Sequence, residues 1–245
     1  PEEIVVAEPA VPTREPFWGY MDLALVLGLL FASIAAIVVV CGVLTVAVPA
    51  WRNDPTPLLL PMQLALYVFI YFCFLVVFKF RYDKPVFTSL GWRRTTIHPL
   101  MLAVAGALLA VAVSALAKLI HTPQVKSPID EITKTPLSLA VFGIMAVTIA
   151  PLFEELFFRG FIQPLLSRTF GVAAGVVLTA VLFGGLHAPE YSWAWQYALA
   201  VSIAGAVFGW VRARTQSIIP STIMHGGYNM VFIVALILMK YGLHK

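Results

Sequence analysis

The chain consists largely of long apolar runs separated by short polar links. A helix needs about 20 apolar residues to cross a bilayer, and seven stretches approach or exceed that length. They cover residues 21–48, 58–78, 99–120, 137–158 with an extension to about 168, 172–186, 195–211 and 218–239. Turn-forming residues such as Pro55, Pro85, Pro123 and Gly171 lie in the links. The pattern predicts an all-α fold, a polytopic membrane bundle with about seven transmembrane helices.

The composition agrees with a membrane protein. Hydrophobic residues make up 60% of the 245 residues, charged residues only 11%, and the mean hydropathy is +0.91. A soluble domain is about 45–50% apolar and about 25% charged, so too few charges are present to cover a surface that faces water. The net charge of +4 comes from Lys and Arg flanking the spans and does not indicate nucleic-acid binding. We therefore expect a multi-pass protein whose main partner is the lipid bilayer.

The distribution of positive charge predicts the orientation. Seven spans place the two ends of the chain on opposite sides of the membrane. Nine Lys and Arg residues fall on the N-terminal side and six on the other side, so the positive-inside rule predicts a cytoplasmic N-terminus. Residues 1–20 form a polar segment without the basic start of a signal peptide. Residues 21–245 form a single integral membrane domain.

Five ionisable residues lie inside the apolar runs, where a charge costs about 2.5–3.5 kcal/mol. They are Glu154, Glu155, Arg159, His187 and His225. Glu155 and Arg159 are spaced i, i+4, which allows an ion pair on one helix face. Glu154 has no such partner, so it must meet a group on another helix or line a wet cavity. Three other charged residues stand at span ends, where we expect them to reach the interface: Asp22, Lys79 and Lys118.

Spacing along the chain suggests that these residues converge. Glu154 lies 16 residues before a turn near Phe170 and His187 lies 17 residues after it, so two continuous helices bring them to nearly the same depth. His225 and Asn229 are spaced i, i+4 and present two hydrogen-bonding groups on one face. One wet site holding these four residues is more economical than four separate structural roles.

Two chemistries fit such a site. A carboxylate beside a histidine can activate water, while a second histidine and an amide stabilise an oxyanion, which together hydrolyse an amide. Alternatively, the carboxylate and the two imidazoles could bind a divalent metal such as zinc, with the amide supporting a ligand. The sequence contains no HExxH motif, and it leaves both schemes open.

Three motifs carry a resemblance to a known family. The CPBP family (CAAX-processing and bacteriocin-processing, or Abi, intramembrane proteases) has the pattern EExxxR, then FxxxH, then HxxxN on successive helices. Here the motifs begin at Glu154, Phe183 and His225 and end at Arg159, His187 and Asn229. The motif-bearing region covers about 137–232. The chain thus resembles a family that includes the type II CAAX prenyl endopeptidase.

The resemblance implies an intramembrane endopeptidase and assigns roles to its residues. Glu154 would activate water with help from His187, Glu155 and Arg159 would support the helix, and His225 and Asn229 would form the oxyanion site. The family is catalogued as metalloproteases, so zinc or another divalent metal is a candidate cofactor, although a metal-free scheme is physically simpler here. The expected partner is a membrane-tethered peptide or a prenylated protein.

Two other functions compete with this interpretation. One is a non-catalytic immunity protein or peptide-binding scaffold that uses the same cavity. A protein that only binds a peptide, however, does not need a carboxylate positioned to act as a base. The other is a small transporter with Glu154 as a proton relay. Secondary transporters are commonly built from internal repeats, and the chain contains none.

Overall fold

The computed structural model describes residues 16–54, 56–125 and 127–242, so most of the expected polar segment 1–20 lies outside the described residues. Helices form nearly all of the described chain. Three of them are π-helical segments and two are 3₁₀ turns. In chain order they are α1 (Tyr20–Ala47), α2 (Pro49–Asn53), the 3₁₀ turn η1 (Thr56–Leu58), α3 (Leu59–Phe74), the π segment η2 (Leu75–Arg81), α4 (Val86–Ser89), α5 (Pro99–Leu119), α6 (Pro128–Ile132), α7 (Pro136–Ile144), the π segment η3 (Met145–Ile149), α8 (Ala150–Glu154), the π segment η4 (Glu155–Ile162), α9 (Gln163–Phe170), α10 (Val172–His187), the 3₁₀ turn η5 (Ala188–Tyr191), α11 (Trp195–Thr215) and α12 (Ile218–Tyr241).

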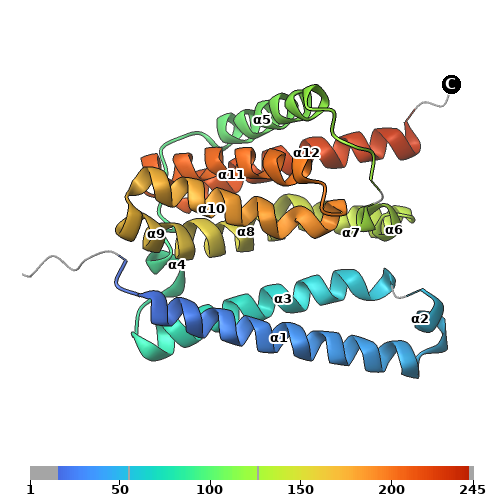
Figure 1. Ribbon diagram of the computed structural model, residues 1–245, viewed down its shortest axis with the longest axis horizontal. Helices are drawn as coiled ribbons and strands as arrows, with labels where there is room; N and C mark the ends of the chain where they lie inside the picture. The colour runs from blue at the N-terminus through green and yellow to red at the C-terminus, as the bar shows by residue number, and fades with distance from the viewer. Residues whose placement is uncertain (1–15, 55, 126, 243–245) are drawn as a thin grey trace, which may run out of the picture.

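The long helices form two groups. Helices α1 and α3 make an antiparallel hairpin, which lies along one side of a bundle built from α5 and the helices from α7 to α12 (Figure 1). Within the bundle, α12 packs against α5 and α11, and α10 packs against α9 and α11. The all-α polytopic fold expected from the sequence is confirmed.

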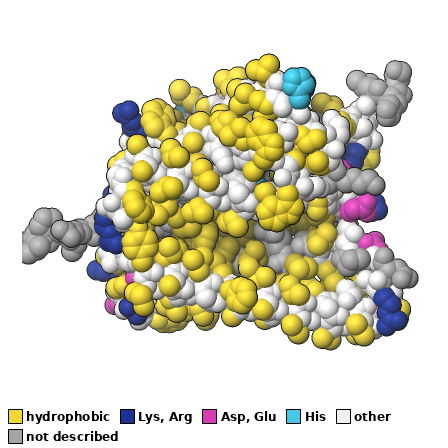
Figure 2. Space-filling model, in the orientation of Figure 1, with side chains coloured by type: hydrophobic (Ala, Val, Ile, Leu, Met, Phe, Trp, Pro, Cys, Tyr) yellow, Lys and Arg dark blue, Asp and Glu magenta, His cyan; other side chains and the backbone are white. Residues whose placement is uncertain are grey.

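Within the described residues, six helices are long and apolar enough to cross a membrane, and they correspond to six of the seven expected spans. The remaining one, α11, has 21 residues and packs between α10, α5 and α12, but it is less apolar than the others. Figure 1 places the start of α1 and the end of α12 at opposite ends of the bundle, as an odd number of crossings requires. Figure 2 shows the charged side chains gathered at these two ends, with a largely apolar band between them. The cytoplasmic location of the N-terminus stays a prediction.

The helix that carries the first motif is continuous over Pro136–Phe170 but includes two π-helical segments, η3 and η4. In a π turn the backbone bonds run from i to i+5, and such wide turns often occur at functional sites. Compared with a regular α-helix, the π turns of η3 and η4 change which side chains and carbonyls of this helix face α12. Its end at Phe170 and the tight connection at Gly171 (φ 87°) form the turn that the sequence predicts between the fourth and fifth spans.

Aromatic side chains join the hairpin to the bundle. Trp18, Phe74, Phe78 and Phe161 are buried in one cluster. The indole Nε1 of Trp18 donates to the carbonyl oxygen of Phe161 at 3.1 Å, which satisfies the one polar atom of that ring. The cluster therefore attaches the hairpin to the helix that carries the first motif.

Asp22, which the sequence places at the end of a span, is buried among protein side chains. Its carboxylate is only 3% exposed and accepts from the backbone N–H of Gly19 and the hydroxyl of Tyr82, both at 2.8 Å. It also pairs with Arg81 Nε at 3.0 Å. The carboxylate thus links the start of α1 to Arg81 at the end of η2. It also caps α1, because a charged acceptor at a helix N-terminus satisfies backbone N–H groups that have no partner in the helix.

Replacing Asp22 with alanine is expected to lower the free energy of unfolding by about 1–3 kcal/mol, because the Gly19 N–H and the Tyr82 hydroxyl lose their acceptor. Thermal unfolding in detergent measures the effect. The control is Asp83→Ala, since Asp83 is exposed and pairs with Lys79 on the surface. Equal melting temperatures for the two variants would show that Asp22 does not stabilise the hairpin.

Candidate functional site

Glu155 and Arg159 form a fully buried ion pair. Both lie on η4, both side chains have an exposure of 0%, and Arg159 Nη1 lies 2.9 Å from Glu155 Oε1. The i, i+4 pairing expected from the sequence is therefore present. Arg159 Nη2 also donates to the carbonyl oxygen of Gly205 on α11 at 2.9 Å. The pair thus ties η4 to α11 in the middle of the bundle.

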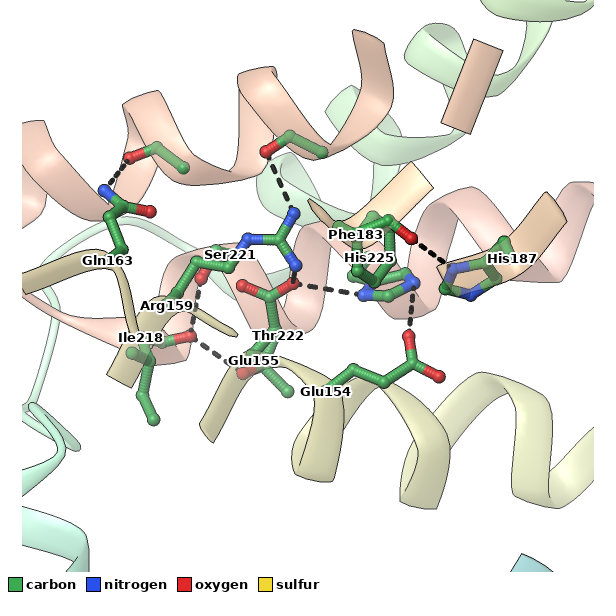
Figure 3. Close-up of polar contacts among 12 residues, drawn as sticks. Glu154, Glu155, Arg159, Gln163, Phe183, His187, Ile218, Ser221, Thr222 and His225 are labelled. Atoms are coloured by element: carbon green, nitrogen blue, oxygen red, sulfur yellow. Dashed lines mark hydrogen bonds and ion pairs between the residues drawn. The ribbon is translucent and has the colours of Figure 1, made fainter. Parts of the chain in front are cut away.

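His225 on α12 joins this pair to Glu154 (Figure 3). Its Nδ1 lies 3.2 Å from Glu155 Oε1, and its Nε2 lies 3.6 Å from Glu154 Oε2. The Glu155 carboxylate is paired with Arg159, so it accepts and Nδ1 of His225 donates. The ring is nearly buried, whereas the Glu154 side chain is 21% exposed. Glu154 is therefore the acid that both meets a partner on another helix and reaches the surface of the site.

Asn229 lies one turn beyond His225 and contacts η3. Its Nδ2 donates to the carbonyl oxygen of Ala146 at 2.8 Å. A close approach of α12 to η3 permits this bond, because a Cβ at Gly226 would lie 2.6 Å from the carbonyl oxygen of Val147. One N–H of the Asn229 amide is therefore engaged with the backbone, and the other is the N–H that could serve a ligand.

His187 ends α10, and its Nδ1 contacts a backbone carbonyl. Its Nδ1 lies 2.7 Å from the carbonyl oxygen of Phe183. A carbonyl oxygen only accepts, so Nδ1 carries the proton and Nε2 presents a lone pair. Close packing of α10 on α11 positions this end of the helix, since a Cβ at Gly184 would collide with the carbonyl oxygen of Ala198.

Phe183 is the residue that brings the three motifs together. Its ring centroid lies 4.5 Å from that of His187 and 5.8 Å from that of His225. On its other side the Arg159 guanidinium lies 4.4 Å from the ring centroid, a cation–π distance. The aromatic residue of the second motif therefore separates His187 from the buried ion pair and packs against both.

Several polar residues near the site were not predicted from the sequence, among them Ser221, which hydrogen-bonds Glu155. Glu190 on η5 interacts electrostatically with His187 and Glu154. Tyr67 on α3 is buried, stacks on Phe153 and interacts electrostatically with Glu154. Gln163 is buried and donates to the carbonyl oxygen of Gly209 at 2.8 Å. The position of Glu190 three residues after His187 was the one signal available, because i and i+3 side chains align in a 3₁₀ turn.

The side chains that the structure describes do not form a metal-binding cluster. Across residues 16–54, 56–125 and 127–242, no three His, Cys, Asp or Glu side chains are grouped closely enough to hold a metal ion. In the described part of the chain the residues of this site thus do not form a three-ligand set for zinc, and the mechanism below has no step through a metal.

Comparison with known proteins gives one match. Residues 135–231 match the family model described as Type II CAAX prenyl endopeptidase Rce1-like. The matched region contains all three motifs, which confirms the resemblance to the CAAX protease family. It supports a CAAX-type intramembrane endopeptidase as the general class of activity. No curated protein and no solved structure matches the chain significantly.

Proposed function

We propose that this protein is an intramembrane endopeptidase that hydrolyses a peptide bond of a membrane-tethered, prenylated substrate with water activated by Glu154. The observation that carries the proposal is the contact of Glu154 with His225, from helices far apart in the sequence, at an ion pair buried inside a membrane bundle. A structural role needs only the Glu155–Arg159 pair. The additional, partly exposed acid beside an imidazole is what hydrolysis needs.

In the first step, the Glu154 carboxylate takes a proton from a water molecule as the water oxygen attacks the carbonyl carbon of the scissile bond. The carbonyl π electrons move to oxygen, so a tetrahedral oxyanion forms. Nε2 of His187 is an acceptor in a neutral ring whose Nδ1–H donates to the Phe183 carbonyl. It can therefore orient the same water by accepting its second hydrogen.

His225 and Asn229 stabilise the oxyanion in this scheme. A donor role for Nε2 of His225 requires protons on both ring nitrogens, with the positive charge placed between the carboxylates of Glu154 and Glu155. The second N–H of the Asn229 amide is the other donor, and the Ala146 carbonyl holds that amide in place. Fixed donors aimed at a developing charge are worth about 3–4 kcal/mol each in comparable sites. The C–N bond then breaks, and the leaving amine takes the proton from Glu154.

The substrate class follows from the matched family, whose name specifies a prenyl endopeptidase. A lipid-anchored peptide would reach a site within the bilayer by lateral diffusion. We propose that the scissile bond directly follows the lipidated cysteine.

Purified protein in proteoliposomes is expected to cleave a peptide with a farnesylated cysteine and to keep its rate in a metal chelator, since the described residues include no group of three metal-binding side chains. Liquid chromatography with mass spectrometry measures the products, and metal analysis of the same sample gives the bound metal content.

A chelator-dependent loss of activity that zinc restores would replace the metal-free scheme with a metal-dependent one. Peptide binding without cleavage would favour the immunity or scaffold interpretation. Solute uptake by the proteoliposomes without cleavage would favour a transporter.

A further inference from the structure

An elongated apolar groove lies between the first half of the motif-bearing helix and α12. It has a volume of about 490 Å³. The residues that line it are Pro136, Leu139, Ala140, Gly143, Ile144, Val147, Thr148, Met230, Ile233, Ile237 and Tyr241. The polar Thr148 hydroxyl among them is satisfied within its own helix by the Ile144 carbonyl oxygen at 2.6 Å. The groove therefore suits a hydrocarbon chain.

We propose that this groove seats the isoprenoid chain of the substrate's lipidated cysteine. The inference rests on the proposed function and adds to it the place where the lipid lies.

The groove begins next to the candidate oxyanion site. Val147 and Met230 line its inner end, and each directly follows one partner of the hydrogen bond between Ala146 and Asn229. From Met230 the groove follows α12 to Tyr241, a length of about 16 Å at the helical rise of 1.5 Å per residue. It therefore extends from the reacting groups towards the end of the bundle where α12 ends.

The chemistry of the reaction requires a lipid site at this place. The carbonyl that becomes the oxyanion belongs to the same residue whose sulfur carries the isoprenoid chain. Only a few bonds separate the oxyanion from the first carbon of the lipid, so a lipid seat must start next to the oxyanion donors. The groove meets this condition because Met230, which lines it, directly follows Asn229 in α12.

The groove would act mainly by orienting the substrate. Lipid tails are as apolar as the groove, so moving the isoprenoid chain out of the bilayer yields little hydrophobic free energy. A chain fixed along α12 instead holds the cysteine carbonyl against Glu154, and such positioning can change the rate by large factors. The expected signature is therefore selectivity for a lipidated substrate.

The test compares two phenylalanine variants on one helix. Ala140 and Val141 are adjacent on α7 and both exposed, but Ala140 lines the groove and Val141 does not. The measured quantity is the ratio of kcat/KM for a farnesylated peptide to that for the same peptide with S-methylcysteine. We expect Ala140→Phe to lower this ratio about tenfold because the ring fills the groove, and Val141→Phe to leave it as in the wild type.

Equal ratios for the wild type and Ala140→Phe would contradict the proposal that the groove holds the isoprenoid chain, while leaving the proposed function intact. A wild-type protein that cleaves neither peptide would overturn both.

Photo-crosslinking of the wild-type protein gives a second measurement that does not depend on a variant folding. A farnesyl-diazirine peptide should label α7, η3 and α12. Labelling elsewhere would contradict the proposal, as would a photoactivatable phospholipid that labels the groove and is not displaced by the peptide.

Discussion

Replacing Glu154 with glutamine is expected to lower kcat for cleavage of the farnesylated peptide by about 10²–10⁴-fold. The amide keeps the size of the side chain but cannot take a proton from water. Peptide binding should change little, because Glu154 lies at the edge of the buried cluster and is partly exposed. Single-turnover cleavage and peptide binding, measured on the same preparation, separate the two effects.

The matched control is Glu131→Gln, an equal chemical change at an exposed acid that pairs with Lys134 on the surface. It should cleave like the wild type. Full activity of Glu154→Gln would remove Glu154 as the base. Loss of cleavage with an intact cellular phenotype would instead support the immunity or scaffold function.

Replacing Arg159 with methionine is expected to lower the free energy of unfolding by about 3–5 kcal/mol, because removing one partner of a buried ion pair leaves the other charge uncompensated. Here that charge is Glu155, whose side chain has an exposure of 0%. The bond to the Gly205 carbonyl and the packing against Phe183 are lost with it. Thermal unfolding in detergent measures the loss.

The double variant Glu155→Gln with Arg159→Met should recover part of this loss, because it removes both charges together. Arg214→Met is the control at an exposed arginine on α11 that lies over the Trp210 ring, and it should unfold close to the wild-type temperature. A single Arg159→Met variant as stable as this control would show that the buried pair does not hold η4 in place.

The Glu154→Gln and Arg159→Met variants test different functions of the neighbouring residues Glu154 and Glu155. Glu155 is buried, paired with Arg159 and in contact with Nδ1 of His225, so its main effect is on the position of that ring. Glu154 contacts Nε2 of the same ring and is partly exposed. His225 thus contacts Glu155, which holds the ring in place, and Glu154, which we propose acts as the base. We therefore expect the loss of the Glu155–Arg159 pair to lower stability and the loss of the Glu154 carboxylate to lower activity.

Some features of the site could be predicted from the sequence because they depend on local spacing. The Glu155–Arg159 pair follows from the i, i+4 geometry of a helix, and the turn near Phe170 follows from the glycine after it. The burial and the partners of Asp22 were not predicted, for the opposite reason. Its position at a span end is local, whereas its partner Arg81 comes from another helix, and no spacing rule indicates that contact.

The sequence by itself determined that this protein is a helical membrane bundle and which polar residues its apolar helices carry, because hydropathy and helical periodicity act over short stretches of chain. Only the tertiary structure decided that Glu154 meets Nε2 of His225, that one N–H of Asn229 is taken by the Ala146 carbonyl, and that Glu190 and Tyr67 lie near Glu154. These relations depend on how helices cross and on where π turns shift a carbonyl. Such packing is set by all the side chains between the helices rather than by the spacing within any one of them.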